Sequence, residues 1–149
     1  MSSWGNDYQL HSIVGNSIEF VWELIAPYLA NAVDYGDGKY SLEGIKKMIR
    51  DKQAFLFFVS NQIGVMGVLV LKINEYECSR RACLFLLGGK NLDEWMEFFE
   101  PIKNWVAQAG CDAIELFGRP GWERKLKNFG FEKTHIVLRL NLKEKNHVR

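Results

Sequence analysis

The chain has 149 residues, of which 48% are hydrophobic and 25% are charged, and its net charge is +1. These values fit one domain with a single substantial core, and the near-neutral charge gives no general attraction to nucleic acid or to a membrane surface. No apolar run reaches the length of about 18 residues that a membrane-spanning helix needs. The best candidate, Ile63 to Ile73, is closed by Lys72 and Asn74.

Cysteine and histidine usage points to a reducing compartment without a structural metal. The three cysteines are an odd number, the three histidines are scattered, and the N-terminus lacks a basic-then-apolar signal pattern. Reduced thiols in a cytoplasmic protein are the expected consequence. The residues concerned are Cys78, Cys83, Cys111, His11, His135 and His147.

The first third of the chain predicts one strand and two helices. Tyr8 to Val14 has the pattern of a strand. Apolar residues then recur at spacings of three and four from Ile18 to Val33, which predicts a helix with a kink at Pro27. Ser41 is a suitable N-cap for a second helix, whose apolar stripe is Leu42, Ile45, Met48 and Ile49.

Three apolar runs follow, at residues 54–59, 63–73 and 81–87. Each is apolar on both alternating faces, and short turns join them. This pattern predicts an antiparallel meander of buried strands with helices on both faces. Gly64 and Gly67 are expected to mark a bulge or a close approach of two backbones.

The remaining third predicts a helix, a strand, a helix and a last strand. Residues 91–109 carry a long apolar stripe with Pro101 expected to bend the helix midway. Residues 111–117 predict a strand and residues 120–129 a short helix, with Gly130 as a left-handed C-cap. Residues 131–142 predict a final strand.

This element order predicts an α+β fold with a mixed, mostly antiparallel central sheet and helices on both faces. We expect one domain over residues 1–142, followed by a polar C-terminal tail at 143–149. A generic α+β sandwich is the alternative arrangement of the same elements.

The segment from Trp105 to Leu116, a short helix, and then Gly130-Phe131-Glu132-Lys133 together resemble the C-terminal half of the GNAT family of N-acetyltransferases. More narrowly, the chain resembles the small GNAT-like proteins that tailed bacteriophages encode. The resemblance implies an acetyl-CoA site between the fourth and fifth strands, with a glycine-rich loop holding the pyrophosphate at a helix N-terminus.

The corresponding loop here is Leu87-Gly88-Gly89-Lys90-Asn91, which lacks part of the family's motif. Its backbone and Lys90 are expected to bind the pyrophosphate, or else the loop is a tight turn capped by Asn91. Arg124 belongs to a basic cluster on the short helix. That cluster either contacts CoA phosphates or nucleic acid, or is a solvated helix face.

For catalysis, the resemblance implies a glutamate near the start of the fourth strand as base for the amine, and Glu75 and Glu77 lie there. The alternative is that both belong to a solvated turn. The family's tyrosine, a proton donor to the thiolate, is replaced by Leu126. Cys83 fits a small core residue better than a nucleophile.

Two functions therefore remain open. The first is an N-acyltransferase that uses acetyl-CoA and an unknown amine, without a metal. The second is a catalytically silent protein that retains the fold and acts as a phage virion component or a binder of a host factor. Virion or host proteins would then be its partners, and aromatic residues on the helix at 91–109 allow a homo-oligomer.

Overall fold

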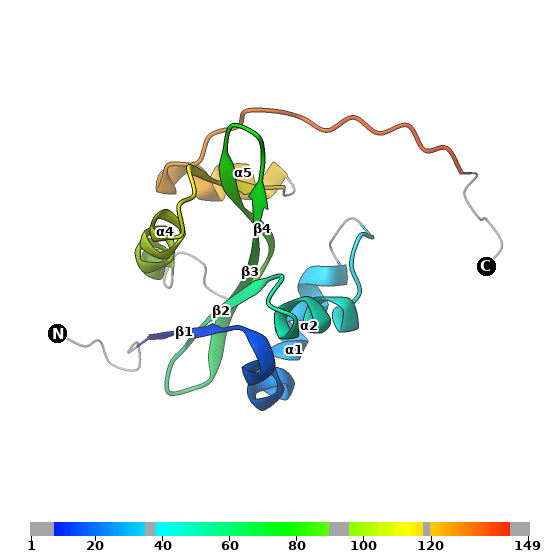
Figure 1. The fold of residues 1–149 in the computed structure, drawn as a ribbon. Helices are drawn as coiled ribbons and strands as arrows, with labels where there is room; N and C mark the ends of the chain where they lie inside the picture. The colour runs from blue at the N-terminus through cyan, green and yellow to red at the C-terminus, as the bar shows by residue number, and fades with distance from the viewer. Residues whose placement is uncertain (1–7, 35–37, 90–95, 118–119, 144–149) are drawn as a thin grey trace. The chain divides into compact units, whose positions relative to one another are not determined.

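The computed structural model describes residues 8–34, 38–89, 96–117 and 120–143 (Figure 1). The chain divides into two compact units, residues 1–117 and 118–149, and each is described by itself. The prediction of a single domain over 1–142 stays a prediction. No helix in the described ranges is both long enough and apolar enough to cross a bilayer.

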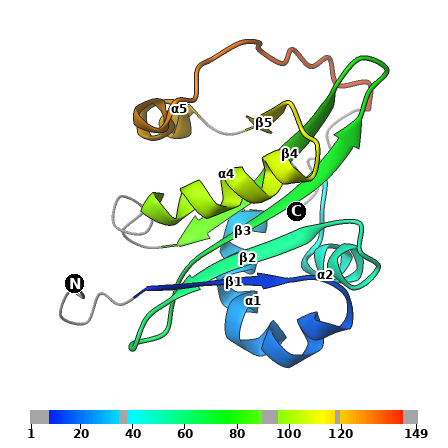
Figure 2. The ribbon, with the colours of Figure 1, turned by 60° about the vertical axis from the view of Figure 1, so that its left-hand side comes forward.

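The first unit is built on a five-stranded sheet in which the strands lie in chain order (Figures 1 and 2). The first four strands form an antiparallel meander, and the fifth is parallel to the fourth. The sheet is therefore mixed and mostly antiparallel, as predicted. The strands are β1 (Gln9–Ile13), β2 (Phe55–Ser60), β3 (Val65–Glu75), β4 (Arg80–Gly89) and β5 (Ala113–Leu116).

Two helices, α1 (Ile18–Asp34) and α2 (Leu42–Arg50), cover one face of the sheet. Their fully buried side chains pack against alternate residues of β2 and β3, among them Leu56 and Val70. The predicted cap is confirmed, because the Ser41 Oγ accepts a hydrogen bond of 3.0 Å from the Gly44 N–H. A short 3-10 turn, η1 (Gly15–Ser17), leads from β1 into α1.

The opposite face is covered by α4 (Phe99–Gln108), which follows the 3-10 turn η2 (Met96–Phe98). The Trp105 ring lies 5.0 Å from that of Phe55 and 5.4 Å from that of Phe57, measured between centroids. Helices on both faces are thereby confirmed. Pro101 lies in the first turn of α4, where its missing N–H costs no helical hydrogen bond, and the predicted bend there stays a prediction. Asn91, the predicted start, lies outside the described residues.

The second unit contains α5 (Pro120–Leu126), which continues as the 3-10 turn η3 (Lys127–Phe129). Gly130 ends it with a φ of 93°, in the left-handed region. The Phe131 N–H bonds to the Leu126 carbonyl at 3.3 Å, which closes the turn. The predicted short helix and its glycine stop are both confirmed.

The predicted strand at 131–142 is wrong. Residues 131–143 have no assigned strand, although the alternating apolar residues that suggested one are present. Among the residues that the structure describes, no strand forms a ladder with this segment. Alternation alone cannot make a strand, because each strand needs a neighbour for its backbone hydrogen bonds. The apolar side chains are therefore 66–89% exposed, namely Ile136, Val137, Leu138, Leu140 and Leu142.

Two leucines of α1 test how far the core depends on this packing. Leu29 is fully buried and Leu24 is 55% exposed. We expect Leu29→Ala to lower the free energy of unfolding by about 2–5 kcal/mol, because it removes apolar contacts and leaves a cavity. Leu24→Ala is the matched control, with an expected change within about 0.5 kcal/mol. Urea denaturation measures both, and equal losses would contradict the described orientation of α1.

Candidate functional site

β4 contains one residue more than the stretch of β3 beside it. Leu71 of β3 pairs with Leu84 of β4. The next pair joins Val70 to Leu86, so Phe85 has no partner in β3. This arrangement is a β-bulge, which leaves the extra residue out of the ladder and bends the strand.

The bulge also changes which side chains of β4 face the two helical layers. Before it, Leu84 lies on the α4 face, because its partner Leu71 pairs in turn with Phe55, whose ring contacts Trp105. At and after the bulge, Phe85 and Leu86 both pack in the cluster under α1 and α2. Two successive residues therefore contact the same layer, which a regular strand does not allow.

β5 leaves β4 at the same point. The parallel ladder runs from the pair Arg81–Ala113 to the pair Leu84–Leu116 and ends one residue before the bulge. From Phe85 to Gly89, β4 pairs with β3 on one side, and no described strand pairs with it on the other. Among the described residues, the backbone groups that point to that side have no strand partner, as at the edge of a sheet.

A lysine and two aromatic rings lie beside the bulge on the face covered by α1 and α2. Lys72 of β3 donates a hydrogen bond of 3.0 Å from its Nζ to the Tyr40 hydroxyl. The same Nζ lies 5.5 Å from the centroid of the Phe85 ring. The hydrogen bond to Tyr40 raises the pKa of Lys72, and partial burial opposes this without reversing it. Lys72 is therefore a cation at neutral pH.

The residue opposite Lys72 in the ladder is Cys83, which is 3% exposed. Burial raises the pKa of the Cys83 thiol, so the thiol stays neutral. The interpretation of Cys83 as a core residue is confirmed.

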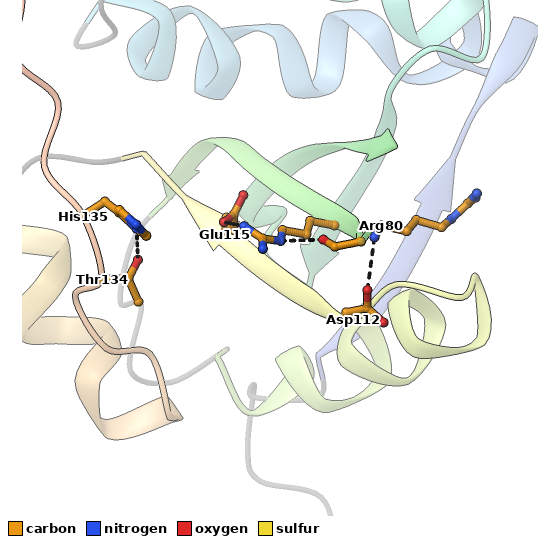
Figure 3. Close-up of polar contacts among 7 residues, drawn as sticks. Arg80, Asp112, Glu115, Thr134 and His135 are labelled. Carbon is orange, nitrogen blue, oxygen red and sulfur yellow. Dashed lines mark hydrogen bonds and ion pairs between the residues drawn. The ribbon is translucent and has the colours of Figure 1, made fainter. Parts of the chain in front are cut away.

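On the other side of Cys83, the β4–β5 ladder places Glu115, which is labelled in Figure 3. The Glu115 carboxylate forms an ion pair of 2.8 Å with Arg81. The Arg81 Nε also donates to the Ser79 Oγ at 2.8 Å, which fixes the guanidinium. These contacts hold a half-buried carboxylate two residues from the bulge.

Of the five residues predicted to bind the pyrophosphate, Lys90 and Asn91 lie outside the described residues. Leu87, Gly88 and Gly89 end β4. A Cβ on Gly88 would lie 3.1 Å from the Tyr28 carbonyl oxygen of α1. Packing against α1 therefore favours a glycine there whether or not a phosphate binds.

Gly89 lies opposite Gly67 in the β3–β4 ladder and has a φ of +145°. A Cβ on Gly89 would lie 2.5 Å from the Met66 carbonyl oxygen and 2.6 Å from the Gly67 Cα. The predicted close approach of two backbones at Gly67 is thus confirmed. The phosphate role of this loop stays a prediction.

The two predicted bases lie at the far end of the β3–β4 hairpin. Glu75 is exposed and forms an ion pair with Arg80, and Glu77 is exposed in the turn. Arg80 precedes Phe85 by five residues, which is about 17 Å along a strand. The structure thus brings neither glutamate to the bulge, and their catalytic role stays a prediction.

The remaining predicted residues belong to the second unit. Arg124 is exposed on α5, and its contact with CoA stays a prediction. Leu126 is 1% exposed, which accounts for an apolar residue at that position. In the described ranges, no three histidine, cysteine or acidic side chains gather in a way that could hold a metal ion.

Sequence reasoning missed Tyr40, Lys72 and Glu115 as site residues. Lys72 continues the strand positions of Val68 and Val70, which are fully buried, so a lysine there was a signal of function. Glu115 likewise interrupts the short apolar strand β5. Tyr40 gave no signal, because its contact with Lys72 joins residues 32 positions apart.

No family model matches the sequence, and a comparison of the sequence with curated proteins finds no match. Solved structures do match the fold. An aminoglycoside N-acetyltransferase in complex with CoA is 11% identical with a TM-score of 0.72, over 95% of this chain and 98% of its own.

Two further structures agree. A predicted acetyltransferase from Clostridium acetobutylicum, with acetyl-CoA, is 10% identical with a TM-score of 0.66, over 94% of this chain and 99% of its own. An aminoglycoside acetyltransferase from an uncultured soil metagenomic sample is 14% identical with a TM-score of 0.67, over 93% of this chain and 98% of its own. At these identities the likeness shows the fold. The chain has the GNAT fold, as the resemblance implied.

The end of β4 offers a test of the close approach at Gly89. Gly89 and Gly64 have similar φ values, +145° and +152°, but a Cβ on Gly64 meets nothing within 4 Å. We expect Gly89→Ala to cost more stability than Gly64→Ala, because only Gly89→Ala adds a clash with backbone atoms to the shared strain. Chemical denaturation measures the two free energies of unfolding. Equal losses would show that β3 can move away from Gly89.

Proposed function

We propose that the domain transfers an acyl group from acyl-CoA to an amine. The observation that carries this proposal is the coincidence of the bulge at Phe85 with the end of the β4–β5 ladder at Leu84 and Leu116. It provides unpaired backbone at one point inside a rigid sheet. Two solved structures with this fold contain CoA or acetyl-CoA, which supports the proposal that this domain binds acyl-CoA.

The open side of β4 suits acyl-CoA, because its extended, amide-bearing arm can bond to an unpaired strand much as another strand would. Acyl-CoA supplies the acyl group as a thioester, whose thiol has a pKa of about 8.5 and can leave without a proton donor at Leu126. The pyrophosphate would then lie towards the end of β4, where Leu87, Gly88, Gly89, Lys90 and Asn91 are its proposed contacts. Arg124 is a further proposed contact.

Backbone at the bulge would polarise the acyl carbonyl. A bulged residue leaves the ladder, so an N–H at Phe85 or Leu86 can point to a ligand and not to β3. A donor held rigidly at the place where negative charge develops typically contributes about 3–4 kcal/mol to catalysis. The buried packing of Leu86 keeps this part of β4 fixed.

The amine must lose a proton as its nitrogen bonds to the acyl carbon. Glu115 is well placed to take this proton, directly or through a water molecule, because it pairs with Cys83 two residues before Phe85. Glu75 and Glu77 remain alternative bases. Their distance from the bulge along β4 makes them less suitable than Glu115.

One observation favours the second candidate function, a silent protein that binds a phage virion protein or a host factor. The five apolar residues between Ile136 and Leu142 are largely exposed. An exposed segment with alternating apolar side chains can add to the sheet of another protein. This candidate does not require acyl-CoA to bind.

Titration calorimetry with acetyl-CoA and CoA distinguishes the two candidates. If the proposal is right, acetyl-CoA binds with a dissociation constant in the micromolar range, because the open backbone of β4 is already formed. The control is free pantetheine, which should bind more weakly for lack of the pyrophosphate. Absence of acetyl-CoA binding at millimolar ligand would exclude the acyltransferase and leave the binding protein.

Glutamine variants identify the base. We expect Glu115→Gln to lower kcat by about 10²-fold or more while acetyl-CoA affinity stays unchanged, because the amide cannot accept a proton. Glu75→Gln is the matched control and should keep its kcat. The readout is CoA thiol released from acetyl-CoA in the presence of an amine. A loss of kcat in Glu75→Gln, with an unchanged kcat in Glu115→Gln, would instead identify Glu75 as the base.

A further inference from the structure

Two lysines, Lys72 and Lys39, form no ion pair with a carboxylate among the described residues. Arg81, the other cation on this part of the sheet, is neutralised by Glu115 at 2.8 Å. Lys72 bonds instead to the Tyr40 hydroxyl. Lys39 lies with its Nζ 5.7 Å from the centroid of the Phe117 ring, directly after β5. Within the described residues, no carboxylate forms an ion pair with Lys72 or Lys39.

Three other lysines of the first unit have a carboxylate partner, whereas Lys52, like Lys72 and Lys39, forms no ion pair with a described residue. Lys46, Lys47 and Lys103 form ion pairs of 2.6–3.1 Å with Glu19, Asp51 and Glu100. Lys72 differs from these three because it is half-buried on β3 and forms no ion pair with a carboxylate in the part of the chain that the structure describes. The Tyr40 hydroxyl and two aromatic rings stabilise its charge, and an ammonium group held in this way is suited to a charge-assisted hydrogen bond with an anionic group of a ligand.

The surroundings of Lys72 hold its charge in a defined place. Its Nζ lies 5.6 Å and 5.5 Å from the centroids of the Tyr40 and Phe85 rings. The two rings themselves pack at 4.9 Å between centroids. The Tyr40 hydrogen bond uses one of the three protons of the ammonium, so two remain for a ligand.

Lys72 lies on the same face of the sheet as Phe85, the face covered by α1 and α2. Lys72 contacts the ring of Phe85, the bulged residue. The charges of Lys39 and Lys72 act to lower the pKa of the Cys83 thiol, and the charge of Glu115 acts to raise it. In the sheet, Lys72 and the proposed base Glu115 are the neighbours of Cys83 on its two sides, and Lys39 contacts the residue that follows β5.

We propose that Lys72, assisted by Lys39, binds a carboxylate or phosphate group of the acceptor amine. This inference rests on the proposed acyltransferase function. It assigns the acceptor to the class of small anionic amines, such as amino acids or phosphorylated amino sugars, in which the amine and the anionic group lie a few bonds apart. Glu115 takes the proton from the amine, and Lys72 fixes the other end of the acceptor.

The same charges disfavour polycationic acceptors. An amine with further ammonium groups would place like charges next to Lys39 and Lys72, and like-charge contacts at a binding site cost affinity. The site therefore selects by charge, and neutral amines should fall between the two classes.

The test uses pairs of acceptors that differ only in the anionic group. Glutamate-class amino acids are compared with their amides, and glucosamine phosphate is compared with glucosamine. CoA release gives KM and kcat for each acceptor, and calorimetry gives its affinity without turnover. The wild-type protein should prefer the anionic member of a pair by about 10- to 100-fold in KM, the usual contribution of a charge-assisted hydrogen bond. The preferred pair shows whether a carboxylate or a phosphate is bound.

Lys72→Met keeps an unbranched apolar side chain of nearly the same length and removes its charge. We expect it to abolish the preference by raising KM for the anionic acceptor about 10- to 100-fold, with unchanged values for the neutral partner and for acetyl-CoA. Lys72→Arg should restore part of the preference. Lys103→Met is the control, because Lys103 is an exposed lysine on α4 with its own carboxylate partner.

Three outcomes would overturn the inference. They are equal use of both members of every pair, an unchanged preference in Lys72→Met, and preference for a polycationic acceptor. If acetyl-CoA itself does not bind, the proposed function fails. Calorimetry of the same acceptor pairs with wild-type protein and Lys72→Met then still decides whether Lys72 binds an anion.

Discussion

Successive residues of a β-strand point to opposite faces, so one extra residue reverses the alternation for everything that follows it. Phe85 is that residue in β4. Before the bulge, the odd-numbered Cys83 is paired with Lys72. After it, the even-numbered Leu86 and Gly88 face the layer of α1 and α2. The bulge thus determines which side chains reach the core and where backbone groups leave the ladder.

The glycines at the end of β4 follow from the same reversal. It turns Gly88 towards α1, where a Cβ would make a tight contact of 3.1 Å with the Tyr28 carbonyl oxygen. Gly89 then lies against the backbone of Met66 and Gly67. Close packing is therefore a sufficient reason for both glycines. A pair of glycines kept for packing cannot be distinguished by sequence from part of a phosphate-binding motif.

The charged groups near the bulge act through their positions more than through stability. The Arg81–Glu115 ion pair is partly exposed, and such pairs contribute only about 0–1 kcal/mol. Glu115 and Lys72 are instead important for their positions. Both project from strands of the sheet, and strands hold functional groups more accurately than loops do. An acceptor held between these two groups would present its amine to a fixed carbonyl site.

Much of the fold was predictable because its signals are local. Three apolar runs separated by short turns predicted β2, β3 and β4, Ser41 predicted the start of α2, and Gly130 predicted the stop after η3. The bulge was not predictable, because the run Leu84-Phe-Leu-Leu87 is apolar at every position and carries no alternation to interrupt.

The misses have a common physical cause. The alternating apolar residues at 131–142 are typical of an extended chain. They do not show whether a neighbouring strand is present to accept and donate its backbone hydrogen bonds. The Lys72–Tyr40 contact and the pairing of Glu115 with Cys83 likewise depend on tertiary neighbours far apart in sequence. Glu75 and Glu77 have the expected position near the start of β4 in the sequence, but their distance from the bulge depends on the register of the sheet.

Amide-resolved hydrogen exchange of the isotopically labelled protein, with and without acetyl-CoA, tests the central claim most directly. The account predicts that acetyl-CoA slows exchange of amides between Phe85 and Gly89, where β4 has an open side, and leaves the amides of β1 and β2 unchanged. Acetyl-CoA that binds without protecting any amide in that stretch would contradict the assignment of the bulge as the acyl-transfer site.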